Sequence, residues 1–234
     1  MPPTAFTVRE VVHATPRTRI IRLDASTLPF AFTAGQAVMV GLHDSPLRKP
    51  YSIASAPWEV ARTGVMQLLL QIDDSGALDP HLELAAPGTM LDVEGPFGTF
   101  GLPPEATDYP VLLIAGGTGI APLRSMLMER LSSATKTAIS IVYSARSPEA
   151  FAFRPELDAL QNAGRVKVHF TVTRDEGGPW PGRRGRIDQD LLRSALPSAD
   201  TLCLICGPPQ LVRDTKALLV GIGVRPARVL TEEY

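Results

Sequence analysis

Long hydrophobic runs are missing from this chain of 234 residues. No apolar stretch approaches the roughly 18 residues that a membrane-spanning helix needs, so we expect no membrane span. Residues 1–4 also lack the charged region and the following apolar stretch of a secretory signal. Together these absences predict a soluble, cytoplasmic protein.

The chain has no excess of charge of one sign. It has 23 Lys and Arg residues against 24 Asp and Glu residues, which gives a formal net charge of −1 at pH 7. This balance argues against a nucleic-acid binder with a uniformly basic surface, although it is compatible with a local basic patch. The composition is 44% hydrophobic and 20% charged, as in globular proteins of one or two domains.

Cysteine is scarce, because the chain has only Cys203 and Cys206. Their C-x-x-C spacing is also found in redox and zinc motifs. However, residues 201–206 have the apolar pattern of a buried strand, and residues three apart on a strand point to opposite faces. We therefore expect no disulfide and no metal site, and the cysteine run of an iron–sulfur cluster is absent as well.

Residues 1–102 have the pattern of an antiparallel β domain. Short β-branched or apolar segments, interrupted by Gly, Pro, Asp and Ser, lie at residues 6–23, 37–42, 50–54, 66–72 and 90–94. Several short strands of this kind favour a β-barrel or a sandwich. A short helix is expected over residues 80–86, with Asp79 as its N-cap.

Residues 103–110 are polar and proline-rich, and we expect them to form a linker to a second domain at residues 111–234. There the strands expected at 111–115, 137–143, 166–172, 202–206 and 229–231 alternate with helices expected at 121–131, 149–162, 188–196 and 209–220. Alternation of this kind predicts a Rossmann-like α/β domain with a parallel sheet. Ligands of such sheets bind beyond the carboxyl ends of the strands.

Two short segments contain the residue types of cofactor sites. Residues 116–122 form a glycine-rich turn between a strand and a helix, where backbone amides can hold a phosphate. Residues 48–55 combine cations with Tyr51 and Ser52, which could stack on a ring and donate a hydrogen bond at its edge. From the residues alone, a tight structural turn explains the first segment equally well. A surface lysine with a core tyrosine explains the second somewhat better.

Two further segments are less informative by themselves. At residues 206–209, Cys206 lies at a strand end, where a parallel sheet presents its ligand, but a small buried cysteine is an equal alternative. Residues 231–234 end in Tyr234, and their spacing indicates nothing further.

Taken together and in order, these motifs resemble the ferredoxin–NADP reductase family over essentially the whole chain. The resemblance depends on Lys-Pro-Tyr-Ser at 49–52, Gly-Pro-Phe-Gly at 95–98, Gly-Thr-Gly-Ile-Ala-Pro at 117–122, Cys-Gly-Pro-Pro at 206–209 and Tyr234. It implies a two-domain protein with an N-terminal antiparallel β-barrel for the flavin and a C-terminal α/β domain for the nicotinamide coenzyme.

The resemblance implies that Tyr51 packs on the isoalloxazine and that Ser52 hydrogen bonds near flavin N5. Lys49 stands where the family has an arginine for the flavin diphosphate, and lysine offers a point charge in place of a planar fork. The family's second diphosphate motif corresponds to residues 76–79, where Asp79 replaces a hydroxyl residue, so backbone amides around Ala77 and Leu78 should contact the phosphate. These departures leave FMN as the alternative to FAD.

The resemblance also places the nicotinamide near Thr118 and Cys206, with Tyr234 covering the flavin ring and Glu232 linked to proton and electron transfer. The candidate catalytic residues are thus Ser52, Cys206, Glu232 and Tyr234. The candidate cofactor-binding residues are Lys49, Pro50, Tyr51, Ser52, Ile72, Gly76, Ala77, Leu78, Gly117, Thr118, Arg146, Thr173, Arg174, Arg186, Gly207, Pro208 and Tyr234.

For the coenzyme, the resemblance to bacterial NADPH-using reductases favours NADPH over NADH. A 2′-phosphate needs cations near the strand ends, and Arg146, Thr173-Arg174 and Arg186 follow expected strands. A solvated basic loop is the alternative explanation for these arginines.

The expected function is hydride exchange between NADPH and FAD and single-electron exchange with a ferredoxin or flavodoxin, by a monomeric enzyme. The reductase component of an oxygenase system, a free flavin or ferric reductase, and a non-catalytic flavin-binding subunit are the alternatives.

Overall fold

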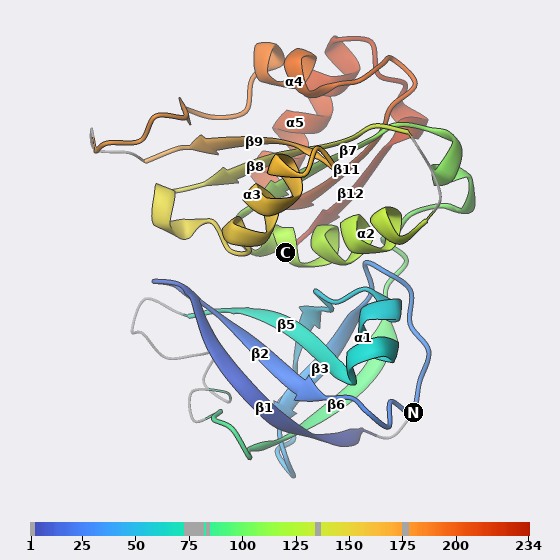
Figure 1. Ribbon diagram of the computed structural model, residues 1–234, viewed down its shortest axis with the longest axis vertical. Coiled ribbons are helices and arrows are strands. Elements are labelled where there is room, and N and C mark those ends of the chain that lie inside the picture. Colours follow the sequence, from blue (N-terminus) through green and yellow to red (C-terminus); the bar gives the residue numbers. More distant parts are fainter. Residues whose placement is uncertain (1–2, 73–81, 83–84, 134–136, 175–177) are drawn as a thin grey trace. The chain divides into compact units, whose positions relative to one another are not determined.

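The computed structural model describes residues 3–72, 82, 85–133, 137–174 and 178–234. The chain divides into two compact units (Figure 1). Unit 1 comprises Met1–Leu102 with Arg124–Glu129, and unit 2 comprises Pro103–Leu123 with Arg130–Tyr234. Each unit has a six-stranded sheet of its own.

The sheet of unit 1 is antiparallel. Its strands are β1 (Thr4–Thr15), β2 (Thr18–Asp24), β3 (Ala37–Leu42), β4 (Lys49–Ser52), β5 (Val65–Gln71) and β6 (Met90–Phe97). They pair in the order β4-β3-β6-β1-β2-β5. An isolated bridge between Ile53, directly after β4, and Leu68 of β5 joins the two ends of this order. The predicted antiparallel barrel is therefore confirmed, since a sheet whose end strands meet has no free edges.

Burial alternates along the strands of unit 1, because successive side chains point to opposite faces of a sheet. In β3, Val38 and Val40 are buried, whereas Ala37 and Met39 are partly exposed. The inward side chains of the strands pack with Phe32 and others into one apolar cluster. The segment 6–23 is divided into β1 and β2 at Pro16, which has no backbone N–H to donate to a strand ladder.

Helix α1 (Pro57–Thr63) was not predicted from the sequence. It begins with Pro57 in its first turn, where the missing N–H costs nothing, and the Glu59 carboxylate accepts a hydrogen bond from the Ala56 N–H at 2.8 Å. It ends at Gly64, whose φ of 65° suits a left-handed cap. The helix expected over residues 80–86 falls largely outside the described residues.

The sheet of unit 2 is parallel. Its strands are β7 (Val111–Gly116), β8 (Ile139–Ala145), β9 (Lys167–Val172), β10 (Arg183–Arg184), β11 (Leu202–Gly207) and β12 (Val229–Glu233), in the order β10-β9-β8-β7-β11-β12. The α-helices are α2 (Ile120–Ser132), α3 (Arg154–Asn162), α4 (Gln189–Ala195) and α5 (Pro209–Gly221). Short 3-10 helices lie at η1 (Pro104–Asp108), η2 (Gly117–Gly119), η3 (Pro148–Ala150) and η4 (Pro226–Arg228). The predicted α/β architecture is thus confirmed.

The helix predicted over residues 149–162 is wrong at its start. The chain forms η3, then the buried residues Phe151 and Ala152, and α3 begins only at Arg154. The interruption lies at Phe153, whose φ of 58° is left-handed and incompatible with a continuous right-handed helix. Within the described part of the chain, no helix combines the length and apolar composition that crossing a membrane requires.

Candidate functional site

The glycine-rich turn of unit 2 lies where β7 passes into α2. Gly119 packs directly on the end of β11, because a Cβ there would lie 2.2 Å from the carbonyl oxygen of Cys206. At Gly117 the chain has a φ of 54°, which favours glycine, and a Cβ would lie 2.9 Å from the hydroxyl of Tyr234. The glycines thus bring the turn, the end of β11 and Tyr234 into contact.

Tyr234 donates a hydrogen bond from Oη to the carbonyl oxygen of Gly116 at 2.7 Å. Burial raises the pKa of this phenol, while hydrogen bonds involving Thr118 and the backbone of Gly119 act to lower it. The hydroxyl is therefore held among the polar groups of the turn, although the residue as a whole is 54% exposed. Tyr234 thus keeps surface open to a ligand, and its hydroxyl is bonded to the Gly116 carbonyl oxygen of the turn.

Cys206 and Glu232 face each other across β11 and β12, where they are register partners. The Cys206 Sγ lies 3.7 Å from Glu232 Oε2. Burial, and then the neighbouring carboxylate, raise the pKa of the thiol, and burial raises the pKa of Glu232. Cys206 is therefore a neutral thiol that can donate a hydrogen bond, and the pair can hold a proton.

Cys203 belongs to the other face of the sheet, where it packs against residues of α4 and α5. Both thiols are free, and the opposite-face prediction from strand periodicity agrees with this arrangement. No cluster of potential metal ligands is present among the described residues.

A cavity of about 570 Å³ lies in unit 2, beyond the ends of β8 and β9. Its lining comprises Ser147, Pro148, Glu149, Arg154, Arg174, Gly178, Pro179, Trp180 and Pro181. Arg174 is exposed, and its backbone N–H donates to the carbonyl oxygen of Arg146 at 2.8 Å, so the two arginines leave adjacent strand ends. Thr173 makes the neighbouring contact through its N–H to the Ala145 carbonyl oxygen at 2.9 Å.

The arginines after β9 fall into two groups. Arg183 forms an ion pair with Asp188, and Arg184 donates to the carbonyl oxygen of Gly178 at 2.8 Å. Arg146, Arg174 and Arg186 have no side-chain partner among the described residues. Arg186 is exposed but does not line the cavity, so the cavity brings only part of the predicted arginine set together.

In unit 1, β4 positions the residues expected at the flavin. Lys49 and Pro50 are exposed, while Tyr51 and Ser52 are half-buried. Tyr51 packs against the edge of the barrel core, and Ile72 is 3% exposed within it. The strand thus presents a cation, an aromatic ring and a hydroxyl in succession. The predicted contacts at residues 76–79, including Gly76, Ala77, Leu78 and Asp79, lie outside the described residues.

Arg48 is held in a separate cluster. Its Nη2 lies 3.0 Å from Asp92 Oδ2, and His43 Nδ1 lies 2.8 Å from Asp92 Oδ1. Burial acts to raise the pKa of Asp92, but hydrogen bonds from His43, Arg48 and the Asp44 N–H outweigh it, so the pKa is lowered. The charge of Arg48 is therefore neutralised locally, and Lys49 is the more accessible cation.

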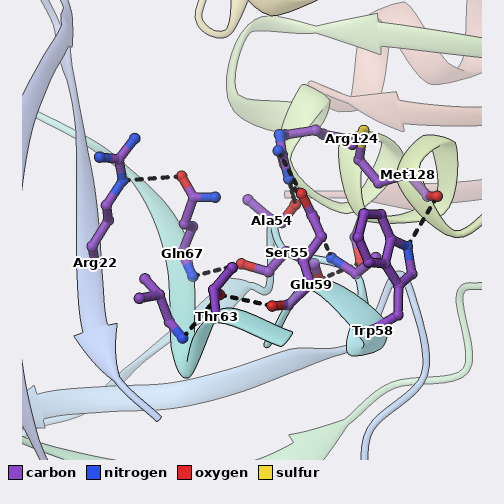
Figure 2. Close-up of polar contacts among 12 residues, drawn as sticks. Arg22, Ala54, Ser55, Trp58, Glu59, Thr63, Gln67, Arg124 and Met128 are labelled. Atoms are coloured by element: carbon purple, nitrogen blue, oxygen red, sulfur yellow. Dashed lines mark hydrogen bonds and ion pairs between the residues drawn. The ribbon is translucent and has the colours of Figure 1, made fainter. Parts of the chain in front are cut away.

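A buried polar network supports the segment after β4 (Figure 2). Arg124 forms two hydrogen bonds to the Glu59 carboxylate, at 2.9 and 3.0 Å, and a third to the Ala54 carbonyl oxygen at 2.7 Å. Ser125 Oγ donates to the Ser55 carbonyl oxygen at 2.7 Å. All of these residues belong to unit 1. They fix the backbone that continues directly from Tyr51 and Ser52.

The sequence analysis missed Arg124 and Glu59. Arg124 is the one charged residue in the largely apolar stretch 120–128 and is only 4% exposed. A single arginine in such a stretch signals a buried charge with a partner, because an unpaired buried charge is too costly. The sequence does not identify that partner.

Comparison with known proteins identifies both units. Residues 5–101 match the oxidoreductase FAD-binding domain family, and residues 113–217 match the oxidoreductase NAD-binding domain family. Ferredoxin–NADP reductase B of Sorangium cellulosum is 34% identical over 215 residues, which are 88% of this chain and 86% of that protein. NADH-cytochrome b5 reductase 1 of Meyerozyma guilliermondii is 30% identical over 90% of this chain and 75% of that protein.

Solved structures show the same fold. The Amycolatopsis cytochrome P450 reductase GcoB superposes with a TM-score of 0.83 at 26% identity, over 99% of this chain and 70% of that one. A ferredoxin NADP+ reductase from Neisseria gonorrhoeae, with bound FAD and NADP, superposes with a TM-score of 0.79 at 22% identity, over 100% of this chain and 99% of that one.

The Arg124–Glu59 pair provides a test of the network in unit 1. We expect Arg124→Met to lower the free energy of unfolding by about 3–5 kcal/mol, because Glu59 is then a buried charge without its partner. Arg9→Met is the matched control, since the Arg9–Asp24 pair at 2.8 Å is exposed and should contribute little to stability. Urea unfolding of the three proteins measures both effects, and equal losses would contradict the structural role of the buried pair.

Proposed function

The chain belongs to the ferredoxin–NADP reductase family of oxidoreductases, and from this we propose that it exchanges hydride between NADPH and a bound FAD and single electrons with a ferredoxin- or flavodoxin-type carrier. The observation that supports this best is in unit 2. There the glycine turn, the Cys206–Glu232 pair and Tyr234 lie together at the carboxyl ends of β7, β11 and β12. This is where a parallel sheet binds its ligand.

The residues of β4 fit the flavin in kind. When bound, a flavin accepts a hydride and releases electrons one at a time, which is chemistry that no side chain supplies. Tyr51 presents a half-buried ring for stacking, Ser52 a hydroxyl for an acceptor nitrogen, and Lys49 an exposed charge for the diphosphate. We propose these three roles together with contacts from Pro50 and Ile72.

In unit 2 we propose that Gly117, Thr118, Gly207 and Pro208 contact the coenzyme. Gly207 packs on Gly116, where a Cβ would lie 3.2 Å from the Gly116 Cα, so the two buried strand ends approach closely and the exposed residues Gly117 and Pro208 follow them. We propose that Cys206 lies beside the ligand as a neutral thiol. The Glu232 carboxylate is the hydrogen-bond partner of that thiol.

NADPH is the proposed coenzyme because of the charges around the cavity. Arg154 and Arg174 line it, and Arg146 lies beside Arg174. Guanidinium groups pair well with a phosphate dianion. Glu149 also lines the cavity, and a carboxylate favours the free ribose hydroxyl of NADH. The two lining arginines outnumber the one carboxylate, which favours the 2′-phosphate.

A reductase for a haem protein is the second candidate. The observation in its favour is the similarity to NADH-cytochrome b5 reductase 1 over 90% of this chain. Such a protein would use NADH and transfer electrons to a cytochrome.

The purified protein should be yellow and should bleach when mixed anaerobically with NADPH. Stopped-flow measurement of the flavin absorbance should show reduction about tenfold or more faster with NADPH than with NADH. The reduced protein is then mixed separately with ferredoxin, flavodoxin, cytochrome b5, free flavin and a ferric chelate. Fastest oxidation by ferredoxin or flavodoxin supports the proposal. Preference for NADH and cytochrome b5 supports the second candidate, and a colourless or unreactive protein contradicts both.

We expect Tyr234→Ser to bind NADP+ about two- to tenfold more tightly than the unmodified protein. The coenzyme then no longer has to displace a hydroxyl that is hydrogen bonded to the Gly116 carbonyl oxygen, a contact of about 0.5–1.5 kcal/mol. Tyr234→Phe retains the ring and should show the effect of the hydroxyl alone. Difference spectroscopy with NADP+ measures the affinities, and unchanged values in both variants would refute this role.

Arg174→Ala should raise KM for NADPH by about tenfold or more and KM for NADH by less than about twofold, because only NADPH has the phosphate that pairs with the guanidinium. Arg193→Ala is the control, since Arg193 is an exposed arginine of α4 that lies 3.9 Å from Asp190. Steady-state kinetics with both coenzymes gives the comparison. Equal changes for NADPH and NADH would show that Arg174 does not read the 2′-phosphate.

A further inference from the structure

Tyr143 of β8 is completely buried, yet its hydroxyl makes two specific hydrogen bonds. Its Oη donates to the carbonyl oxygen of Gly117 at 3.0 Å and accepts from the backbone N–H of Ala152 at 3.2 Å. Burial raises the pKa of this phenol, so the hydroxyl stays neutral and keeps its proton to donate. A phenylalanine would fill an apolar site without the cost of burying a hydroxyl, so the two bonds distinguish this position from ordinary packing.

The first bond fixes the glycine turn. A peptide group is planar and trans, so holding the Gly117 carbonyl oxygen also directs the Thr118 N–H to the opposite side. Tyr234 holds the preceding carbonyl, of Gly116, at 2.7 Å. Two tyrosines therefore orient two consecutive peptide groups in the segment where we propose that the coenzyme binds. Tyr143 is the buried one, so a ligand at the turn does not need to displace it.

The second bond fixes the segment that leads to the cavity. The Tyr143 ring packs edge-on against Phe151, with the ring centroids 5.0 Å apart. Phe151 in turn stacks on Trp180 at 5.7 Å with an interplanar angle of 30°, and Trp180 lines the cavity. Arg154, which also lines the cavity, lies over the Trp180 ring at 4.9 Å. A continuous series of contacts within unit 2 thus joins the turn to the cavity wall.

We propose that Tyr143 is a positioning residue for the dinucleotide: its hydroxyl holds the glycine turn and the 151–153 segment at the spacing that one ligand needs to reach both the turn and the cavity. This inference rests on the proposed function, because it assumes a coenzyme with one end at each place. It goes further in assigning the spacing of the two subsites to one buried hydroxyl. Tyr143 does not contact the ligand in this arrangement.

The test is Tyr143→Phe, which removes the hydroxyl and retains the ring that packs on Phe151. Binding is measured by titration calorimetry with two probes, NADP+ and 2′,5′-ADP, the second of which is the adenosine half of the coenzyme and lacks the nicotinamide half that we propose for the turn. We expect the Kd for NADP+ to rise by about tenfold, and the Kd for 2′,5′-ADP to change by less than about twofold. A general structural defect would weaken both probes alike.

Tyr109→Phe is the matched control, because Tyr109 is another tyrosine of unit 2, whose ring lies 3.6 Å from the Arg228 guanidinium carbon. It should leave both Kd values unchanged. Equal affinity of Tyr143→Phe and the unmodified protein for NADP+, or equal losses for NADP+ and 2′,5′-ADP, would overturn the proposal. Failure of the unmodified protein to bind NADP+ at all would instead count against the proposed function.

Amide hydrogen exchange in the unmodified protein supplies a second measurement that does not depend on the variant folding. The Ala152 N–H is bonded to Tyr143, so NADP+ binding at the turn should slow its exchange together with that of residues 117–119. Slower exchange at the turn with unchanged exchange at Ala152 would also overturn the proposal.

Discussion

The arrangement of unit 2 depends on the close approach of two strand ends. Gly119 follows β7 and lies against the last residues of β11 with no room for a Cβ, since that atom would be 2.2 Å from the Cys206 carbonyl oxygen. Any side chain at this position would separate the glycine turn from β11. The pairing of β11 with β12 places Glu232 within 3.7 Å of the Cys206 thiol, and Tyr234, which follows β12, bonds to the turn. The close approach at Gly119 and the pairing of β12 together assemble groups from three parts of the chain.

Unit 1 achieves the same kind of rigidity by polar means. After β4, the N–H groups of Ile53 and Ala54 donate to the carbonyl oxygens of Gln36 and Gln67, while the carbonyl groups of Ala54 and Ser55 need other donors. Arg124 and Ser125 provide them at Ala54 and Ser55, and Glu59 neutralises the arginine. A buried ion pair of this kind is weak evidence for net stability, because desolvation offsets much of its attraction. Its effect is instead to specify one backbone conformation next to the residues that we propose contact the flavin.

The sequence pattern predicted the parallel sheet well, because strands such as β7 and β11 are continuous apolar runs bounded by turns. β7, β8, β9, β11 and β12 lie within two residues of the predicted ranges. Local exceptions were not predictable in this way. The left-handed Phe153 breaks a helical pattern that looks continuous, and α1 is too short to show a period. Pairs such as Arg124 with Glu59 are 65 residues apart, so only the fold brings them together. Tyr143 looked like one more apolar residue of its strand, since its bonding partners lie on other segments.

The protonation of the unit 2 site restricts the chemistry that its own residues can perform. A raised pKa makes the Cys206 thiolate scarce near neutral pH, and the thiolate is the nucleophilic form. Covalent catalysis by this cysteine would need the opposite environment, with cations or a helix N-terminus lowering its pKa. Glu232 raises it further, and burial keeps Glu232 itself easier to protonate than an exposed carboxylate. A neutral donor beside a protonatable carboxylate can orient a ligand and hold a proton without attacking it. Such a site is suited to a reaction whose reactive groups are brought by bound cofactors, in which the protein fixes positions and charges.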